Sequence, residues 1–277
     1  MQVFQIHMKD EYPFLGENGC DPTLTAYLPS PITEMRDMDW TRKCILICPG
    51  GGYGFVSQRE GEPIALKFAA QGYNAFVLNY SVAPHKFPTA LREAAAAMEL
   101  IYANAAQWKC DTQKIAIIGF SAGGHLAGHY TNCFDCPEVR EVFPESKPVN
   151  ASILSYAVIT SDPKHSHKGS FQNLSGHKEL TAQDHEMFSL ERKVTVKTPP
   201  TFLWHTAPDD CVPVMNSLLY AQALAVNKVP FAVHIYPEGW HGLATVDNTT
   251  NHPLQSNVAH AADWMEAVHK WLKIVFA

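Results

Sequence analysis

The chain has 277 residues and a formal net charge of −6, with 46% hydrophobic and 17% charged residues. This length allows a large buried core, and the composition is typical of a globular enzyme rather than of a disordered chain. The negative charge argues against a nucleic-acid partner, because phosphate binding needs clustered Lys and Arg. No apolar run of about 18 residues occurs, so no membrane span is predicted.

The cysteines and histidines suggest neither disulfides nor a metal site. Seven cysteines is an odd number, and the N-terminus lacks the basic and apolar regions of a secretory signal. We therefore expect free thiols and a cytoplasmic location. Cys133 and Cys136 form a lone C-x-x-C, and His165 and His167 form H-x-H in a polar stretch. Neither supplies the closed ligand set of a metal site, so no metal and no cofactor is expected.

Short apolar runs alternate with longer helical patterns along the chain. This rhythm predicts a mostly parallel sheet of about eight strands, covered by helices on both faces in three layers. Val3–His7 and Leu24–Leu28 come first, as candidate antiparallel edge strands. Six core strands are expected at Cys44–Cys48, Ala75–Leu78, Lys114–Ile118, Ala151–Leu154, Thr201–Trp204 and Phe231–Tyr236. Helices are expected at Glu62–Gln71, Thr89–Gln107, Ala122–Thr131, Val214–Asn227 and Asn257–Ile274.

One segment interrupts this rhythm. Residues 161–198 are polar, contain several histidines and hold no convincing strand. Such a long interruption of a compact domain is usually functional or disordered. Because it lies between two predicted core strands, we interpret it as a small cap or lid insertion in a single domain that spans residues 1–277.

The strongest chemical signal is the G-x-S-x-G sequence Gly119–Gly123, with Ser121 at its centre. It directly follows the apolar strand KIAII and opens a helix of small residues, which is the setting of a nucleophile elbow. Such a turn holds its central residue in a strained conformation, so its neighbours must be small. Ser121 is therefore the predicted nucleophile; the alternative is a serine that only caps a strand–helix turn.

A serine nucleophile needs a base and a carboxylate that orients the base. In chain order the carboxylate comes next, and Asp209 and Asp210 follow a predicted core strand. We favour Asp209, with Asp210 as the alternative. His241 lies in a glycine-flanked loop after the last strand and is the predicted base. His252 is the other downstream loop histidine, but Asn-His-Pro is more typical of a turn.

Three consecutive glycines follow the strand CILIC, ending before Tyr53. Without Cβ atoms the backbone can approach a ligand closely, so the N–H groups of Gly51 and Gly52, with that of Ala122, are the predicted oxyanion hole.

Tyr53, His125 and Phe171 are candidate substrate-binding residues. His125 lies one helical turn after Ser121, although packing is the commoner role of a partly buried histidine.

Together these blocks resemble the α/β-hydrolase esterases related to hormone-sensitive lipase, and more closely an acetyl-esterase, xylan-esterase-like branch. The resemblance extends from CPGGGYGFVSQREGEP through GFSAGGHLAG to HTAPDDCVP and YPEGWHGL. It implies the α/β-hydrolase fold, the triad Ser121, Asp209 and His241, and short-acyl esters as substrates, with acetylated sugars among them. Pro49 stands where related lipases often carry histidine.

The expected activity is therefore hydrolysis of small carboxylic esters through an acyl-enzyme intermediate, with a small-molecule ester as the partner. A peptidase or an amidase or formamidase of the same fold is the alternative, because the same triad cleaves amides. A non-catalytic binding protein of this fold is a further one. The oligomeric state is open, and a homo-oligomer is compatible with the sequence.

Overall fold

A computed structural model describes residues 1–32, 34 and 40–277 of the chain. Within these residues, eight strands form one sheet in the order β1-β2-β4-β3-β5-β6-β7-β8. The strands β1 and β2 pair antiparallel with each other, β2 pairs antiparallel with β4, and every other neighbouring pair is parallel. The mostly parallel, eight-stranded sheet predicted from the sequence is confirmed.

The strands lie close to their predicted positions. They are β1 (Gln2–His7), β2 (Thr23–Leu28), β3 (Arg42–Cys48), β4 (Asn74–Asn79), β5 (Cys110–Phe120), β6 (Ala151–Ser155), β7 (Thr201–Thr206) and β8 (Phe231–Tyr236). One expectation is wrong in part: β2 is not an edge strand, because it lies between β1 and β4. The central strands β3 and β6 and residues 115–120 of β5 are almost wholly buried, as expected for parallel strands covered on both faces.

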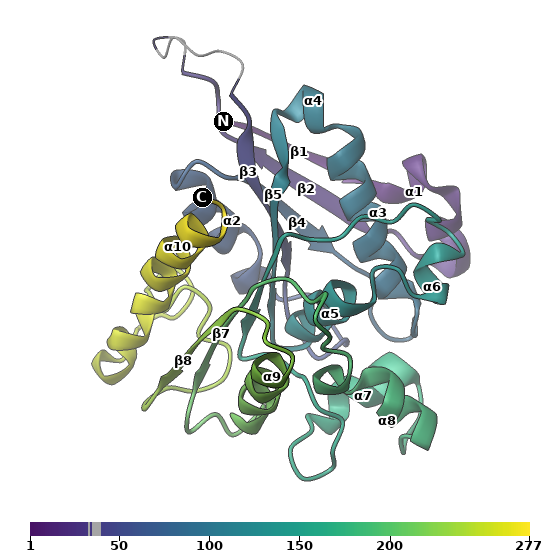
Figure 1. The fold of residues 1–277 in the computed structure, drawn as a ribbon, viewed down its shortest axis with the longest axis vertical. Helices are drawn as coiled ribbons and strands as arrows, with labels where there is room; N and C mark the ends of the chain where they lie inside the picture. The colour runs from purple at the N-terminus through teal and green to yellow at the C-terminus, as the bar shows by residue number, and fades with distance from the viewer. Residues whose placement is uncertain (33, 35–39) are drawn as a thin grey trace.

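Helices cover both faces of the sheet (Figure 1). The helices α2 (Glu62–Ala70) and α10 (Asp263–Val275) pack on one face, where Phe68 and Trp264 are fully buried. The helices α3 (Thr89–Ala103), α5 (Ser121–Cys133) and α9 (Met215–Val226) pack on the other. The remaining helices are short: α1 (Met8–Glu11), α4 (Ala105–Trp108), α6 (Pro137–Arg140), α7 (Lys168–Ser175) and α8 (Ala182–Phe188).

Two predicted helices differ from those observed. The helix expected over Thr89–Gln107 divides at Asn104, whose side-chain amide donates to the carbonyl of Leu100. This local bond competes with continued helical hydrogen bonding. The helix expected from Asn257 begins as a 3₁₀ helix over Ser256–Ala262 and becomes the α-helix α10 only at Asp263.

Residues 161–198 contain α7, α8 and a 3₁₀ helix, and no strand. The start of α8 is well defined, because Thr181 and Asp184 form a reciprocal capping box. Buried Phe171 and Phe188 join this segment to the core cluster that also contains α5. No helix within the described ranges is long and apolar enough to cross a membrane.

Candidate active site

Ser121 lies where β5 ends and α5 begins, in a strained backbone conformation with φ +52°. The turn is tight because the first turn of α5 lies against the end of β3. A Cβ atom at Gly123 would be 2.1 Å from the carbonyl oxygen of Cys48 and 2.2 Å from that of Pro49, so no larger residue fits there. The strand–turn–helix setting predicted for Ser121 is therefore the one observed.

The structure brings three of the predicted residues together. His241 Nε2 lies 2.8 Å from Ser121 Oγ, and His241 Nδ1 lies 2.8 Å from Asp209 Oδ2. Because the carboxylate can only accept, Nδ1 carries the proton and Nε2 accepts from the serine hydroxyl. Asp209 is 6% exposed, whereas Asp210 is an exposed residue. The imidazole thus contacts Asp209, the favoured of the two carboxylates.

The carboxylate of Asp209 is held by three further groups on its own loop and strand. Its Oδ1 accepts the N–H groups of Cys211 (3.0 Å) and Val212 (2.9 Å). Its Oδ2 lies 3.3 Å from Nε2 of His205, a fully buried imidazole that also donates to the carbonyl of Val212 and accepts from Ser217. Sequence reasoning missed His205, although its position four residues before Asp209 was visible.

These contacts keep Asp209 ionised. Burial alone raises the pKa of Asp209, but hydrogen bonds from His205, His241 and the Val212 N–H outweigh burial and hold that pKa well below its usual range. A permanent negative charge therefore lies beside Nδ1 of His241. Such a charge stabilises the imidazolium that forms when the base takes a proton.

The glycine loop after β3 has an unusual backbone. Gly51 (φ +120°), Gly52 (φ +64°) and Tyr53 (φ +56°) all have positive φ values. A Cβ atom at Gly51 would lie 2.0 Å from the carbonyl oxygen of Phe55. In the described part of the chain, no hydrogen bond engages the N–H of Gly51 or Gly52. Both residues line the same pocket as Ser121, so their N–H groups are available to a ligand there.

That pocket has a volume of about 390 Å³, and several polar side chains interrupt a mostly apolar surface. Its lining includes Ser121, His241, Arg59, His167, Asn173 and the exposed ring of Phe55. Two of these come from the 161–198 segment, and Asn173 also donates to the carbonyl of Gly52 (2.9 Å). Burial, and then the neighbouring His241, lowers the pKa of His167, which favours the neutral form of its imidazole. Sequence reasoning had considered His167 only as a metal ligand.

Cys211 also lines the pocket, but its thiol is a poor rival to Ser121 as a nucleophile. Burial raises its pKa, and the carboxylates of Asp209 and Asp210 raise it further. The thiolate, which is the reactive form, is therefore disfavoured.

Tyr53, His125 and Phe171 are not among the described residues that line the pocket. Their exposed fractions are 3%, 0% and 0%, and they pack together under the 161–198 segment. His125 accepts from the Tyr53 hydroxyl at Nδ1 (2.9 Å) and donates from Nε2 to the carbonyl of Phe188 (2.9 Å). The structure therefore does not bring these three side chains to the pocket, and their contact with substrate stays a prediction.

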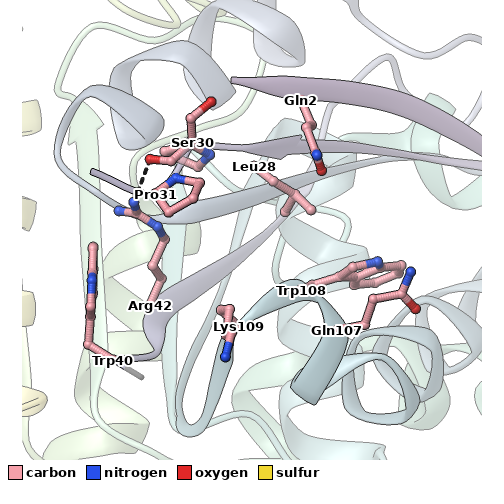
Figure 2. A pocket seen from close by; sticks show the side chains of 10 residues that line it. Gln2, Leu28, Ser30, Pro31, Trp40, Arg42, Gln107, Trp108 and Lys109 are labelled. Carbon is pink, nitrogen blue, oxygen red and sulfur yellow. Dashed lines mark hydrogen bonds between the residues drawn. The ribbon is translucent and has the colours of Figure 1, made fainter. Parts of the chain in front are cut away.

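A larger cavity of about 470 Å³ lies at the opposite edge of the sheet (Figure 2). Its lining includes Trp40, Arg42, Trp108 and Lys109 around the amino ends of β3 and β5. None of the predicted site residues is in this lining. In the parts of the chain that the structure describes, no group of three or more His, Cys, Asp or Glu side chains is arranged to hold a metal ion.

Comparisons with known proteins identify a family and several relatives of this chain. The family model BD-FAE matches residues 32–224. Endo-1,4-beta-xylanase B of Butyrivibrio fibrisolvens is 38% identical over 253 residues, which cover 88% of this chain and 38% of that protein. Acetylxylan esterase of Xylanibacter ruminicola is 31% identical over 209 residues, or 72% of this chain and 41% of that protein. The chain thus spans about two fifths of the length of these two relatives.

Solved structures match over almost the whole chain. The acetyl ester-xyloside bifunctional hydrolase of Caldicellulosiruptor lactoaceticus is 34% identical with a TM-score of 0.85, and the match covers 98% of this chain and 96% of that one. This likeness and the sheet order show that the chain has the α/β-hydrolase fold.

Proposed function

This chain belongs to the BD-FAE family, and on that basis we propose that it is a serine carboxylic-ester hydrolase with Ser121, Asp209 and His241 as its triad. The observation that carries the proposal is the continuous hydrogen-bonded chain from Ser121 Oγ through His241 to Asp209, with both distances at 2.8 Å.

In the proposed reaction His241 takes the proton of Ser121, and the serine oxygen attacks the ester carbonyl. The N–H groups of Gly51, Gly52 and Ala122 stabilise the oxyanion. The alcohol leaves with the proton from His241, and water then hydrolyses the acyl-enzyme by the same steps. No step requires a metal or an organic cofactor.

We further propose a short acyl group, acetyl above all, and a sugar as the alcohol. The polar side chains of Arg59, His167 and Asn173 in the pocket lining support a hydroxylated alcohol. The ring of Phe55, which is 63% exposed, offers a flat apolar surface to it. An acetylxylan esterase of Xylanibacter ruminicola is among the relatives of this chain. The 161–198 segment, which contributes His167 and Asn173 to the pocket, is the proposed cap. The unpaired thiols of the seven cysteines favour a cytoplasmic location.

The test combines turnover with covalent labelling. Wild-type protein should hydrolyse p-nitrophenyl acetate faster than the dodecanoate ester and should react with a fluorophosphonate probe. Ser121→Ala should lose labelling and should lower turnover by at least about 10⁴-fold while remaining folded. Labelling without ester turnover, but with turnover of formyl or aminoacyl amides, would favour the amidase alternative. Absence of both labelling and turnover would favour a binding protein.

A further inference from the structure

Glu60 is a buried carboxylate that the proposed reaction does not use. It is 3% exposed, lies in the lining of the active-site pocket, and forms no ion pair within the described residues. Its Oε2 accepts the N–H of Gly50 at 2.8 Å, and its Oε1 accepts the hydroxyl of Tyr156 at 2.7 Å. A carboxylate in such a position is costly unless both oxygens are hydrogen-bonded, and here both are.

Tyr156 extends this contact to the loop that carries the base. It directly follows β6 and is 2% exposed. Its hydroxyl accepts the N–H of Ala244 at 3.0 Å, and its ring lies edge-on to the His241 ring with centroids 5.1 Å apart. Burial, and then the Glu60 carboxylate, raises the pKa of Tyr156 well above its usual value, so the hydroxyl keeps its proton and donates it to Glu60.

Glu60 therefore joins two loops that come from distant parts of the chain. Gly50 immediately precedes the residues with N–H groups that face the pocket, and a Cβ atom at Gly50 would lie 2.9 Å from Cβ of Ser121. Three successive positive φ values follow Gly50, a conformation that costs free energy unless surrounding contacts hold it. The Glu60 carboxylate supplies one such contact, and through Tyr156 it is also connected to the His241 loop.

We propose that Glu60 is a positioning residue: its carboxylate holds the oxyanion loop and, through the Tyr156 hydroxyl, the His241 loop in the relative positions that the reaction needs. This inference rests on the proposed esterase function. It concerns the alignment of groups that stabilise the transition state, so removing the carboxylate should lower kcat much more than it changes KM.

The test compares two carboxylates two residues apart that each accept a tyrosine hydroxyl. Glu62 accepts from Tyr27 at 3.2 Å and is not in the pocket lining, which makes Glu62→Gln the matched control. In Glu60→Gln one amide oxygen replaces two acceptors, and the NH₂ group faces either the Gly50 N–H or the Tyr156 hydroxyl. We expect kcat for p-nitrophenyl acetate to fall by about 10- to 100-fold in Glu60→Gln, with KM within about threefold of wild type. Glu62→Gln should leave both within about twofold.

A second variant tests the connection itself and covers the case in which Glu60→Gln folds poorly. Tyr156→Phe keeps the ring against His241 and removes only the hydroxyl, so kcat should fall by about 3- to 10-fold. In the double variant Glu60→Gln/Tyr156→Phe, the loss should be smaller than the product of the single losses, because both changes break the same chain of hydrogen bonds.

Rates are divided by the number of sites that a fluorophosphonate probe labels at completion, so that misfolded protein does not count. The inference is overturned if Glu60→Gln matches Glu62→Gln per labelled site, if KM alone changes, or if the two losses simply multiply. If the wild type neither labels nor hydrolyses esters, the proposed function has failed instead.

Discussion

The carboxyl and amino edges of the parallel sheet each border a cavity, and different chemical groups line the two cavities. At the carboxyl edge, β3, β5, β7 and β8 lead into the loops of Gly51, Ser121, Asp209 and His241. At the amino edge, Arg42 is part of the lining of the larger cavity, and its guanidinium donates to the carbonyl of Ser30 (Figure 2). The guanidinium also donates to the carbonyl of Gly72 and stacks on Trp40.

The larger of the two cavities is not the one that Ser121 and His241 of the proposed triad line. The amino-edge cavity is larger, but Arg42 in its lining contacts neutral carbonyls and an aromatic ring. At the carboxyl edge Ser121, His241 and Asp209, the proposed nucleophile, base and orienting carboxylate, are hydrogen-bonded in sequence. Open α/β sheets expose their binding loops at the carboxyl ends of the strands, and this chain follows that rule. We therefore expect substitutions at the carboxyl edge to change activity and those at the amino edge to change only stability.

The largest expected effect is a difference in activity between variants of two adjacent carboxylates at the carboxyl edge, Asp209 and Asp210. Asp209→Asn should lower kcat/KM by about 10³- to 10⁴-fold, because an amide whose oxygen stays on the Cys211 and Val212 N–H groups turns its NH₂ donor toward His241 Nδ1 and so favours the wrong tautomer. The fold should survive, since the amide oxygen can still accept the N–H groups of Cys211 and Val212. Asp210→Asn should stay within about threefold of wild type. Steady-state kinetics on both variants would decide, and a larger loss in Asp210→Asn would reject the assignment.

A smaller effect concerns pH and stability. Burial lowers the pKa of His125 to about 4 from an ordinary value of 6.5. The folded state resists protonation of His125, so the neutral imidazole contributes to the free energy of unfolding. This contribution is complete above about pH 6.5 and is lost as pH falls toward 4, by up to about 3 kcal/mol. His125→Gln, which keeps a donor for Phe188, should flatten the decline in unfolding free energy over this range. Urea titrations at several pH values measure it.

His269, near the amino edge, is the control for His125 in this experiment. Burial lowers its pKa to about 4 as well, but it is partly exposed, so His269→Gln should flatten the same decline less and leave kcat/KM unchanged. An unchanged pH profile in His125→Gln would contradict the role of burial.

The smallest effect is expected at the amino-edge cavity. Arg42→Lys keeps the charge but cannot donate to both carbonyls in the same geometry. Unfolding free energy should fall by about 1–2 kcal/mol, measured by thermal and urea denaturation, with kcat/KM within about twofold of wild type. A loss of turnover per labelled site beyond that range would show that the two edges are not independent.

Local sequence patterns predicted much of the fold. The continuous apolar runs of β3, β5 and β7 and the helical periodicity of the alanine-rich α3 are strong signals. From them the sequence predicts the bounds of each element to within a few residues. The break at Asn104 and the 3₁₀ start of α10 were missed, because element boundaries depend on single local hydrogen bonds.

The sequence alone was enough to predict the members of the proposed triad: Ser121 in a strand–turn–helix motif, and Asp209 and His241 after later strands. The groups that surround these three side chains depend on the tertiary structure. The hydrogen-bonded chain from Gly50 through Glu60 and Tyr156 to Ala244 joins residues that are distant in the sequence. No short-range periodicity encodes such contacts, because burial and hydrogen bonding between loops depend on how the whole sheet brings strand ends together.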